Sequence, residues 1–135
     1  MSTKVLDAYA LIAFLQDEPG ADKFEELILQ AQDGKIDLAI CVVNLGEVWY
    51  SIARSNSAKI AARYLEQIQG MPIEIVDADW ELTQQAAIYK ARGNISYADC
   101  FAAALAKLRN GAVVTGDREF DVLKDEIEVV WLKSK

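Results

Sequence analysis

Six consecutive apolar residues, Leu38-Ala39-Ile40-Cys41-Val42-Val43, predict a β-strand that other elements cover on both faces. A strand with one wet face would alternate apolar and polar side chains, and this run does not alternate. Strands covered on both faces are typical of parallel sheets, in which crossover helices pack on either side. The rest of the chain should then alternate between strands and helices.

Short apolar runs and helical patterns do alternate along the chain. Further strands are predicted at residues 4–6, 73–76, 112–115 and 128–131. Apolar residues at helical spacing fill the segments between the strands, and Gly34, Gly93 and Gly111 mark helix ends. This order predicts an α/β fold, a three-layer α/β/α sandwich with about five mostly parallel strands between helices.

Length and composition bound the class of protein. The 135 residues, 53% of them hydrophobic and none in a linker-like stretch, predict a single domain over residues 1–135. No apolar stretch approaches the roughly 18 residues that a membrane span needs. The short apolar run before Asp7 leaves no room for a signal-peptide core. We therefore expect a cytoplasmic protein that does not associate with membranes.

Two residue counts and the net charge limit the chemistry. The chain has no histidine, which excludes Ser–His–Asp and Cys–His nucleophiles and His-ligated zinc. Cys41 and Cys100 are too few for a four-cysteine metal site and are expected to be buried and inert. The net charge of −7 argues against a module that grips nucleic acid by charge alone. It does not argue against an enzyme whose carboxylates hold divalent cations.

Four acidic residues fall where predicted strands end and helices begin. Asp7 follows the first strand directly, and Asp117 lies two residues after the strand at 112–115. Glu47 and Asp99 are expected in the first turns of helices that begin near residues 44 and 96. In parallel α/β sheets, ligands bind outside the carboxyl ends of the strands. The four acids are therefore candidates for one site.

Helix capping is the alternative interpretation of each acid taken alone. Asn44 and Glu47 have the spacing of a capping box, Ser96 and Asp99 have a near variant, and the other two acids have the position of N-caps. Apolar or small neighbours of Asp7, Glu47 and Asp99, however, indicate that these acids are partly buried. Clustered, desolvated carboxylates repel one another unless a proton or a cation joins them. Mg²⁺ or Mn²⁺ would supply that cation.

Four segments carry a resemblance to a known family: residues 5–12 (VLDAYALI), 45–48 (LGEV), 96–106 (SYADCFAAALA) and 114–120 (VTGDREF). They resemble the motifs of PIN-domain nucleases and, more narrowly, of the VapC toxins of bacterial and archaeal toxin–antitoxin pairs. The likeness spans essentially the whole chain, in order and with family-like spacing. It implies a PIN-like fold with about five parallel strands between helices, and cleavage of RNA with Mg²⁺ or Mn²⁺.

The resemblance also implies roles for individual residues. Asp7 and Asp99 would be direct metal ligands, and Glu47 would complete the site. Asp117 would help to ligate the metal or to orient its surroundings, and Thr115 resembles the family hydroxyl beside it. The four acids would together form the catalytic site.

Further residues and partners follow from the same resemblance or from position. Glu119 stands where family members often carry a second acid, which gives it a supporting place. Lys90, Arg92 and Arg118 lie near the site in sequence and are candidates for contacts to RNA phosphates. As a VapC-like toxin the protein would bind a small antitoxin that inserts a segment near the acidic pocket and shuts it. It would also form a homodimer through its helical face.

A non-catalytic acidic α/β module is the main alternative. Receiver domains carry an acidic pair after the first strand, whereas this chain has the single acid Asp7, and the apolar run at 38–43 ends without an acceptor Asp. A haloacid-dehalogenase-type phosphatase would need Asp-x-Asp, and Asp7-Ala8-Tyr9 lacks the second acid. A PIN domain acting mainly as a scaffold would keep the acids without cleaving. Metal-dependent RNA cleavage separates an enzyme from all of these.

Overall fold

The computed structural model describes residues 2–132 of the chain. Its strands are β1 Ser2–Leu6, β2 Ile36–Cys41, β3 Ile73–Val76, β4 Ala112–Thr115 and β5 Glu128–Trp131. Its helices are α1 Ala8–Leu15, α2 Ala21–Gln32, α3 Val42–Ser55, α4 Ala58–Gln69, α5 Trp80–Arg92 and α6 Tyr97–Leu108, with a 3₁₀ helix, η1, at Arg118–Leu123.

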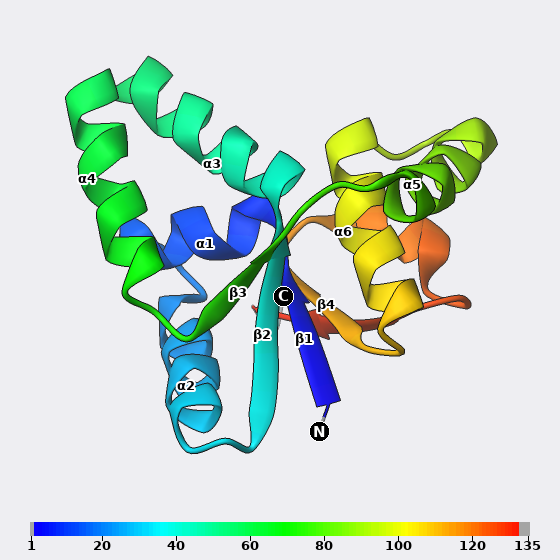
Figure 1. Ribbon diagram of the computed structural model, residues 1–135, viewed down its shortest axis with the longest axis horizontal. Coiled ribbons are helices and arrows are strands. Elements are labelled where there is room, and N and C mark those ends of the chain that lie inside the picture. Colours follow the sequence, from blue (N-terminus) through cyan, green and yellow to red (C-terminus); the bar gives the residue numbers. More distant parts are fainter. Residues whose placement is uncertain (1, 133–135) are drawn as a thin grey trace.

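The five strands form one parallel sheet in the order β3-β2-β1-β4-β5 (Figure 1). From β1 the chain builds β2 and β3 on one side, and then returns to add β4 and β5 on the other. The strand order therefore reverses between β1 and β4. A parallel sheet binds its ligands at such a switch point, beyond the carboxyl ends of the strands.

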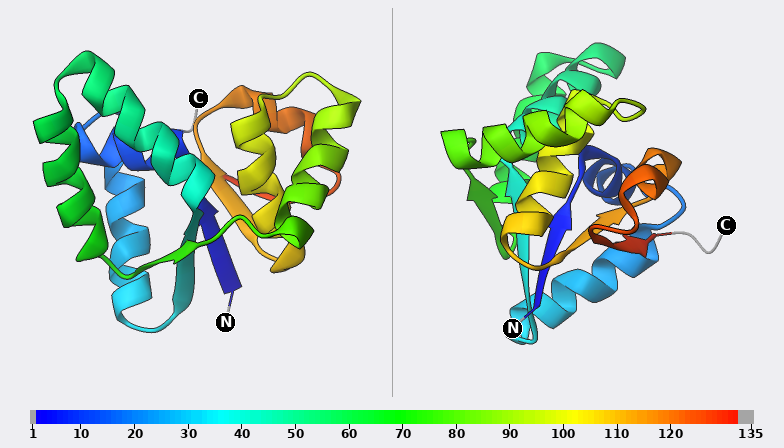
Figure 2. Two further views of the ribbon diagram at one scale, coloured as in Figure 1. Left: turned by 45° about the horizontal axis from the view of Figure 1, so that its top comes forward. Right: turned by 90° about the vertical axis from the view of Figure 1, so that its right-hand side faces the viewer.

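Two apolar cores cover the two faces of the sheet, because successive side chains of a strand point to opposite faces. Val5 and Val113 pack with the buried residues of α5 and α6, whereas Leu6 and Val114 pack with those of α1, α2, α3 and α4. Figures 1 and 2 show these two groups of helices on either side of the sheet. The predicted three-layer α/β/α sandwich with parallel strands is confirmed.

One predicted boundary is wrong. The strand expected over residues 38–43 ends at Cys41, and α3 begins with Val42. Val42 and Val43 pack against the same core as the buried side chains of α6. Since the strand and the first turn of the helix are both covered by protein, the apolar pattern continues across the junction and does not mark it.

The two cysteines and the lengths of the helices can be compared with what the composition predicts. Cys41 and Cys100 are both buried and free, as expected. Burial raises the pKa of the Cys100 thiol to about 11, which keeps it protonated and unreactive. Among residues 2–132, no helix has both the length and the apolar character needed to cross a membrane.

Candidate metal centre

Two of the predicted acids leave the sheet from neighbouring strands at the switch point. Asp7 follows β1 directly and is 1% exposed, and its Oδ1 accepts a hydrogen bond from the backbone N–H of Ala10 at 2.9 Å, which caps α1. Asp117 follows β4 and caps η1, because its Oδ1 accepts from the N–H of Glu119 at 2.9 Å. Since β1 and β4 pair in parallel, both caps lie at the carboxyl edge of the sheet.

Thr115, the buried last residue of β4, joins these two acids. Its hydroxyl donates to Oδ2 of Asp7 and accepts from the backbone N–H of Asp117 at 2.9 Å. The single hydroxyl proton is thus directed to the Asp7 carboxylate, while the oxygen fixes the loop that carries Asp117. The hydroxyl lies beside the acids, where the resemblance put it.

The other two acids come from helices in opposite layers. Asp99 lies in the first turn of α6, is 7% exposed, and has its N–H capped by the hydroxyl of Ser96 at 3.2 Å. Glu47 is half-buried on α3. The sequence predicts Glu47 in the first turn of its helix, and this placement is wrong. Because α3 begins at Val42, Glu47 lies in its second turn.

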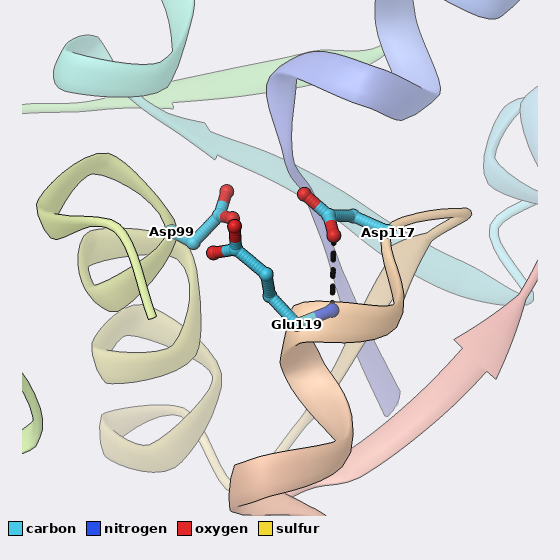
Figure 3. Close-up of side chains that lie close together, drawn as sticks. All are labelled: Asp99, Asp117 and Glu119. Atoms are coloured by element: carbon cyan, nitrogen blue, oxygen red, sulfur yellow. Dashed lines mark hydrogen bonds between the residues drawn. The ribbon is translucent and has the colours of Figure 1, made fainter. Parts of the chain in front are cut away.

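These side chains converge on one cavity of about 320 Å³. Its lining consists of Asp7, Ala8, Tyr9, Ile12, Glu47, Ser96, Asp99, Asp117 and Glu119. Figure 3 shows Asp99 on α6 near Asp117 and Glu119, and carboxylate oxygens of these three residues lie within 4.8 Å of one another. The structure therefore brings together all four predicted acids and Glu119. Their roles remain predictions.

Glu119 has a definite contact within the site. Its Oε1 accepts a hydrogen bond from the backbone N–H of Ser96 at 3.0 Å. In a capping box that N–H would be bound by the acid three residues on, which is Asp99. Glu119 takes this place from another element, so the carboxylate of Asp99 is left to face the cavity.

Helix capping is observed for some of the acids and not for others. Asp7 and Asp117 are N-caps and also line the cavity, so the two interpretations do not exclude each other. The proposed capping box of Asn44 and Glu47 is wrong. Cys41 holds the N-cap position of α3 without a side-chain bond, and Asn44 already lies inside the helix.

Burial and mutual repulsion both disfavour the charged form of these carboxyls. Burial raises the pKa of Asp7 to about 7, and the carboxylates of Asp117 and Glu47 add to the rise against the hydrogen bonds that Asp7 accepts. Burial, followed by the charges of Asp7, Asp117 and Glu47, raises the pKa of Asp99 to about 8. Burial and nearby carboxylates also raise the pKa of Glu47. The cluster calls for a proton or a cation.

The residues present fit a divalent cation. Apart from the phenol of Tyr9, every ionisable group that lines the cavity is a carboxyl, and no basic side chain of residues 2–132 lines it. Oε1 of Glu47 is buried without a hydrogen-bond partner in the described structure, so it is an available ligand atom. An all-oxygen set of this kind suits Mg²⁺ or Mn²⁺.

The basic residues predicted to contact RNA lie outside the cavity lining. Nζ of Lys90 donates to the carbonyl oxygen of Ile95 at 3.0 Å. Arg92 pairs with Glu126 and stands 5.4 Å from the ring centre of Tyr89. Each of these two side chains thus has a partner within the fold, and their contacts to RNA stay predictions.

Arg118 is held differently from the other two. Its guanidinium stands 4.2 Å from the centre of the Trp131 ring at the end of β5, and it lies 3.9 Å from Asp121. The side chain remains 62% exposed, next to Asp117. The ring orients the positive charge at the carboxyl edge of the sheet without neutralising it.

Tyr9 is a cavity residue that the sequence did not point to. It lines the cavity beside Asp7. Its ring packs so closely on Gly116 that a Cβ there would collide with it. Gly116, between Thr115 and Asp117, is the sequence signal that another side chain packs closely against the backbone here. The sequence does not indicate that this side chain is Tyr9.

Comparisons with known proteins bear on the fold and the family. The chain superposes on VapBC from Salmonella typhimurium with a TM-score of 0.74 and 21% identity, over 98% of this chain and 99% of that one. It superposes on VapC20 of Mycobacterium tuberculosis, a sarcin–ricin-loop-cleaving toxin, with a TM-score of 0.69 and 15% identity, over 90% of this chain and 94% of that one. VapBC-5 of the same organism, a member of the VapBC family of toxin–antitoxin systems, gives a TM-score of 0.62 and 22% identity, over 98% of this chain and 99% of that one.

Sequence comparison gives a family and no close relative. The comparison with curated protein sequences found no match. The PIN domain family matches residues 4–126, which include every acid of the cavity. The resemblance seen in the four sequence segments is thereby confirmed, and the chain belongs to the PIN domain family.

Proposed function

We propose that the protein is an endoribonuclease that depends on Mg²⁺ or Mn²⁺ and acts as the toxin of a VapBC-type toxin–antitoxin pair in the cytoplasm. One observation carries the proposal: four acids from four separate segments share a cavity with no basic side chain of the described chain, at the switch point of the sheet. Membership of the PIN domain family and the fold shared with VapC20 support it.

The residues divide the work by position. Asp7 and Asp99, the two most buried acids, would hold the cation directly, and Glu47 would complete its ligands. When bound, a divalent cation supplies Lewis-acid chemistry that activates water and neutralises charge on a phosphate. Glu47 or Asp117 would orient the attacking water and accept its proton. Glu47 suits this role because burial raises its pKa. Thr115 would keep Asp7 in its ligating orientation.

This chemistry predicts the products. Water attacks phosphorus, its oxygen stays with the phosphate, and the bond to the 3′ oxygen breaks, with that oxygen taking a proton as it leaves. The products carry a 5′-phosphate and a 3′-hydroxyl, and the RNA 2′-hydroxyl is not consumed. Mapping of cleavage ends on total RNA with purified protein and Mg²⁺, beside a chelator control, tests the proposal. Intact RNA at every Mg²⁺ and Mn²⁺ concentration would point instead to a scaffold PIN domain.

Arg118→Ala should weaken RNA binding and lower the slope of log affinity against log salt by about one, because one phosphate contact is lost. Its affinity for Mn²⁺ should not change. Arg109→Ala is the matched control, since Arg109 pairs with Glu74 beyond the opposite end of α6 from Asp99. Filter-binding titrations across salt concentrations give both slopes. An Arg118 variant with the wild-type slope would place this residue outside the RNA interface.

The partner in this proposal is a small antitoxin. An apolar groove of about 280 Å³ lies between α3 and α4, lined by Leu45, Val48 and Trp49 among others, and the same helix carries Glu47. An antitoxin segment in this groove would reach the acidic cavity and shut it, where a basic side chain would pair with the carboxylates. The structures of VapBC proteins support this partner. A homodimer through the helical face remains part of the proposal, and light scattering tests it.

Trp49→Glu should prevent co-purification of a co-expressed candidate antitoxin, because it places a charge in the apolar groove. Trp49 is 39% exposed, so the substitution should leave the fold intact. Trp80→Glu on α5, where the tryptophan is 69% exposed, is the matched control and should leave the complex unchanged. Equal recovery of the antitoxin with both variants would exclude the groove as its binding site.

A further inference from the structure

Asn44 connects the two outer layers of the sandwich. It lies in the first turn of α3, is fully buried, and its Nδ2 donates a hydrogen bond to the carbonyl oxygen of Ala98 at 2.9 Å. Ala98 directly precedes Asp99, and Asn44 precedes Glu47 by three residues, about one helical turn. The bond therefore ties the start of α3, about one turn before Glu47, to the start of α6, where Asp99 lies.

The tie is specific in its chemistry. A carbonyl oxygen only accepts, so the amide nitrogen must face Ala98, and Oδ1 of Asn44 is then buried with no hydrogen-bond partner in the described chain. An apolar side chain of similar shape would fill the same space without an orphaned acceptor. Packing alone therefore does not account for an asparagine here.

The position of the tie opposes a known force. Glu47 and Asp99 repel each other and the remaining acids of the cavity, and that repulsion tends to separate α3 from α6. These helices belong to opposite layers of the sandwich and begin at the same end of the sheet (Figure 1), where this hydrogen bond joins their first turns. A neutral hydrogen bond beside the cluster resists the separation without adding charge.

We propose that Asn44 is a positioning residue of the metal centre, which fixes the separation of Glu47 and Asp99 before a cation binds. The assignment rests on the proposed metal-dependent function. It predicts that loss of the amide weakens metal affinity more than it weakens the fold, because the ligands must then be gathered at the moment of binding.

Asn44→Leu should weaken Mn²⁺ binding about tenfold, the lower end of the effect of residues that orient metal ligands. Isothermal titration of the purified, substrate-free protein measures this, and thermal unfolding without metal measures stability in parallel. Leu27→Ala is the matched control for stability: Leu27 is buried on α2, away from the starts of α3 and α6 (Figure 1). It should lower the melting temperature and leave the Mn²⁺ affinity unchanged.

A double-mutant cycle separates positioning from a merely structural role. If Asn44 acts through the spacing of Glu47 and Asp99, Asn44→Leu should cost clearly less than tenfold in a Glu47→Gln background, where one of the spaced charges is gone. The same tenfold loss in both backgrounds, or wild-type affinity for Asn44→Leu, would overturn the assignment. Wild-type protein that binds Mn²⁺ but cleaves no RNA would contradict the proposed function and leave Asn44 testable by the same titration. Wild-type protein that binds no Mn²⁺ would overturn both.

Discussion

Asp7→Asn and Asp99→Asn are each expected to reduce RNA cleavage by about 1,000-fold or more, a loss of about 4 kcal/mol of transition-state stabilisation. Asparagine keeps the size of the side chain, and at position 7 it still offers an oxygen to the N–H of Ala10. What each substitution removes is the negative charge that would hold the cation. Single-turnover cleavage of end-labelled RNA at matched Mg²⁺ measures the effect, and circular dichroism checks the fold.

The chain supplies a close control for this experiment. Asp79 caps α5 as Asp7 caps α1, accepting from the N–H of Leu82 at 2.9 Å, but it lies outside the acidic cavity. Asp79→Asn therefore changes the same charge on the same kind of cap and should cleave like wild type, as should Asp77→Asn.

Two further variants, Glu47→Gln and Asp117→Asn, complete the series. Each should lose most of the RNA-cleaving activity. Near-wild-type cleavage by either the Asp7 or the Asp99 variant would contradict the site. Equal losses in all six variants would indicate general destabilisation instead.

The fold was largely predictable, because the apolar pattern records which faces are covered. The run at 38–43 identified a strand of a parallel sheet, and the alternation of strands and helices identified the sandwich. The end of β2 was not predictable from this pattern, because Val42 and Val43 in α3 are also covered by protein. The strand order was not predicted either. It depends on which crossover returns past β1, and that choice leaves no local mark in the sequence.

The site was predictable in its acids and not in the contacts that arrange them. Strand ends place Asp7 and Asp117 together whatever lies between them in sequence, so topology alone brings them to one edge. Ser96 makes one contact that the local sequence predicts and one that it does not. Its hydroxyl caps Asp99, as its spacing predicts, but its own N–H is bound by Glu119 from another element. The bond from Asn44 to Ala98 likewise spans 54 residues.

The protein without metal should become more stable as the pH falls from about 8 towards 5. The pKa of Asp7 is raised to about 7 and that of Asp99 to about 8, both from an ordinary value of 3.8. Between about pH 4 and 8 the folded state therefore holds more protons than the unfolded state, so lower pH favours folding. Each extra proton adds at most about 1.4 kcal/mol per pH unit. Urea unfolding at pH 8, 7, 6 and 5 measures the slope.

A bound divalent cation should remove most of this dependence between about pH 5 and 8, because it keeps the carboxylates charged in the folded state, as they already are in the unfolded chain. At pH 7, Mg²⁺ or Mn²⁺ at 100 times its dissociation constant should add about 2.7 kcal/mol, several degrees in melting temperature for a domain of this size. Raising the pH towards 8 should then strengthen the stabilisation by metal while it weakens the apo protein. A melting temperature independent of both cations would contradict the metal centre.

Asp99→Asn distinguishes a metal ligand from a helix residue that is acidic by chance. The N–H of residue 99 still donates to Ser96 in the variant, so the helix start is kept. Loss of a carboxylate that is 7% exposed and faces Asp7 should relieve both desolvation and repulsion, and raise apo stability at pH 8 by about 2 kcal/mol. The same substitution should flatten the pH dependence and reduce the response to Mg²⁺, since a ligand is gone. Greater stability without metal, combined with a weaker response to it, is the signature of a residue that serves a cation at the expense of the fold. A variant less stable than wild type, with an undiminished Mg²⁺ response, would instead show that Asp99 serves only α6.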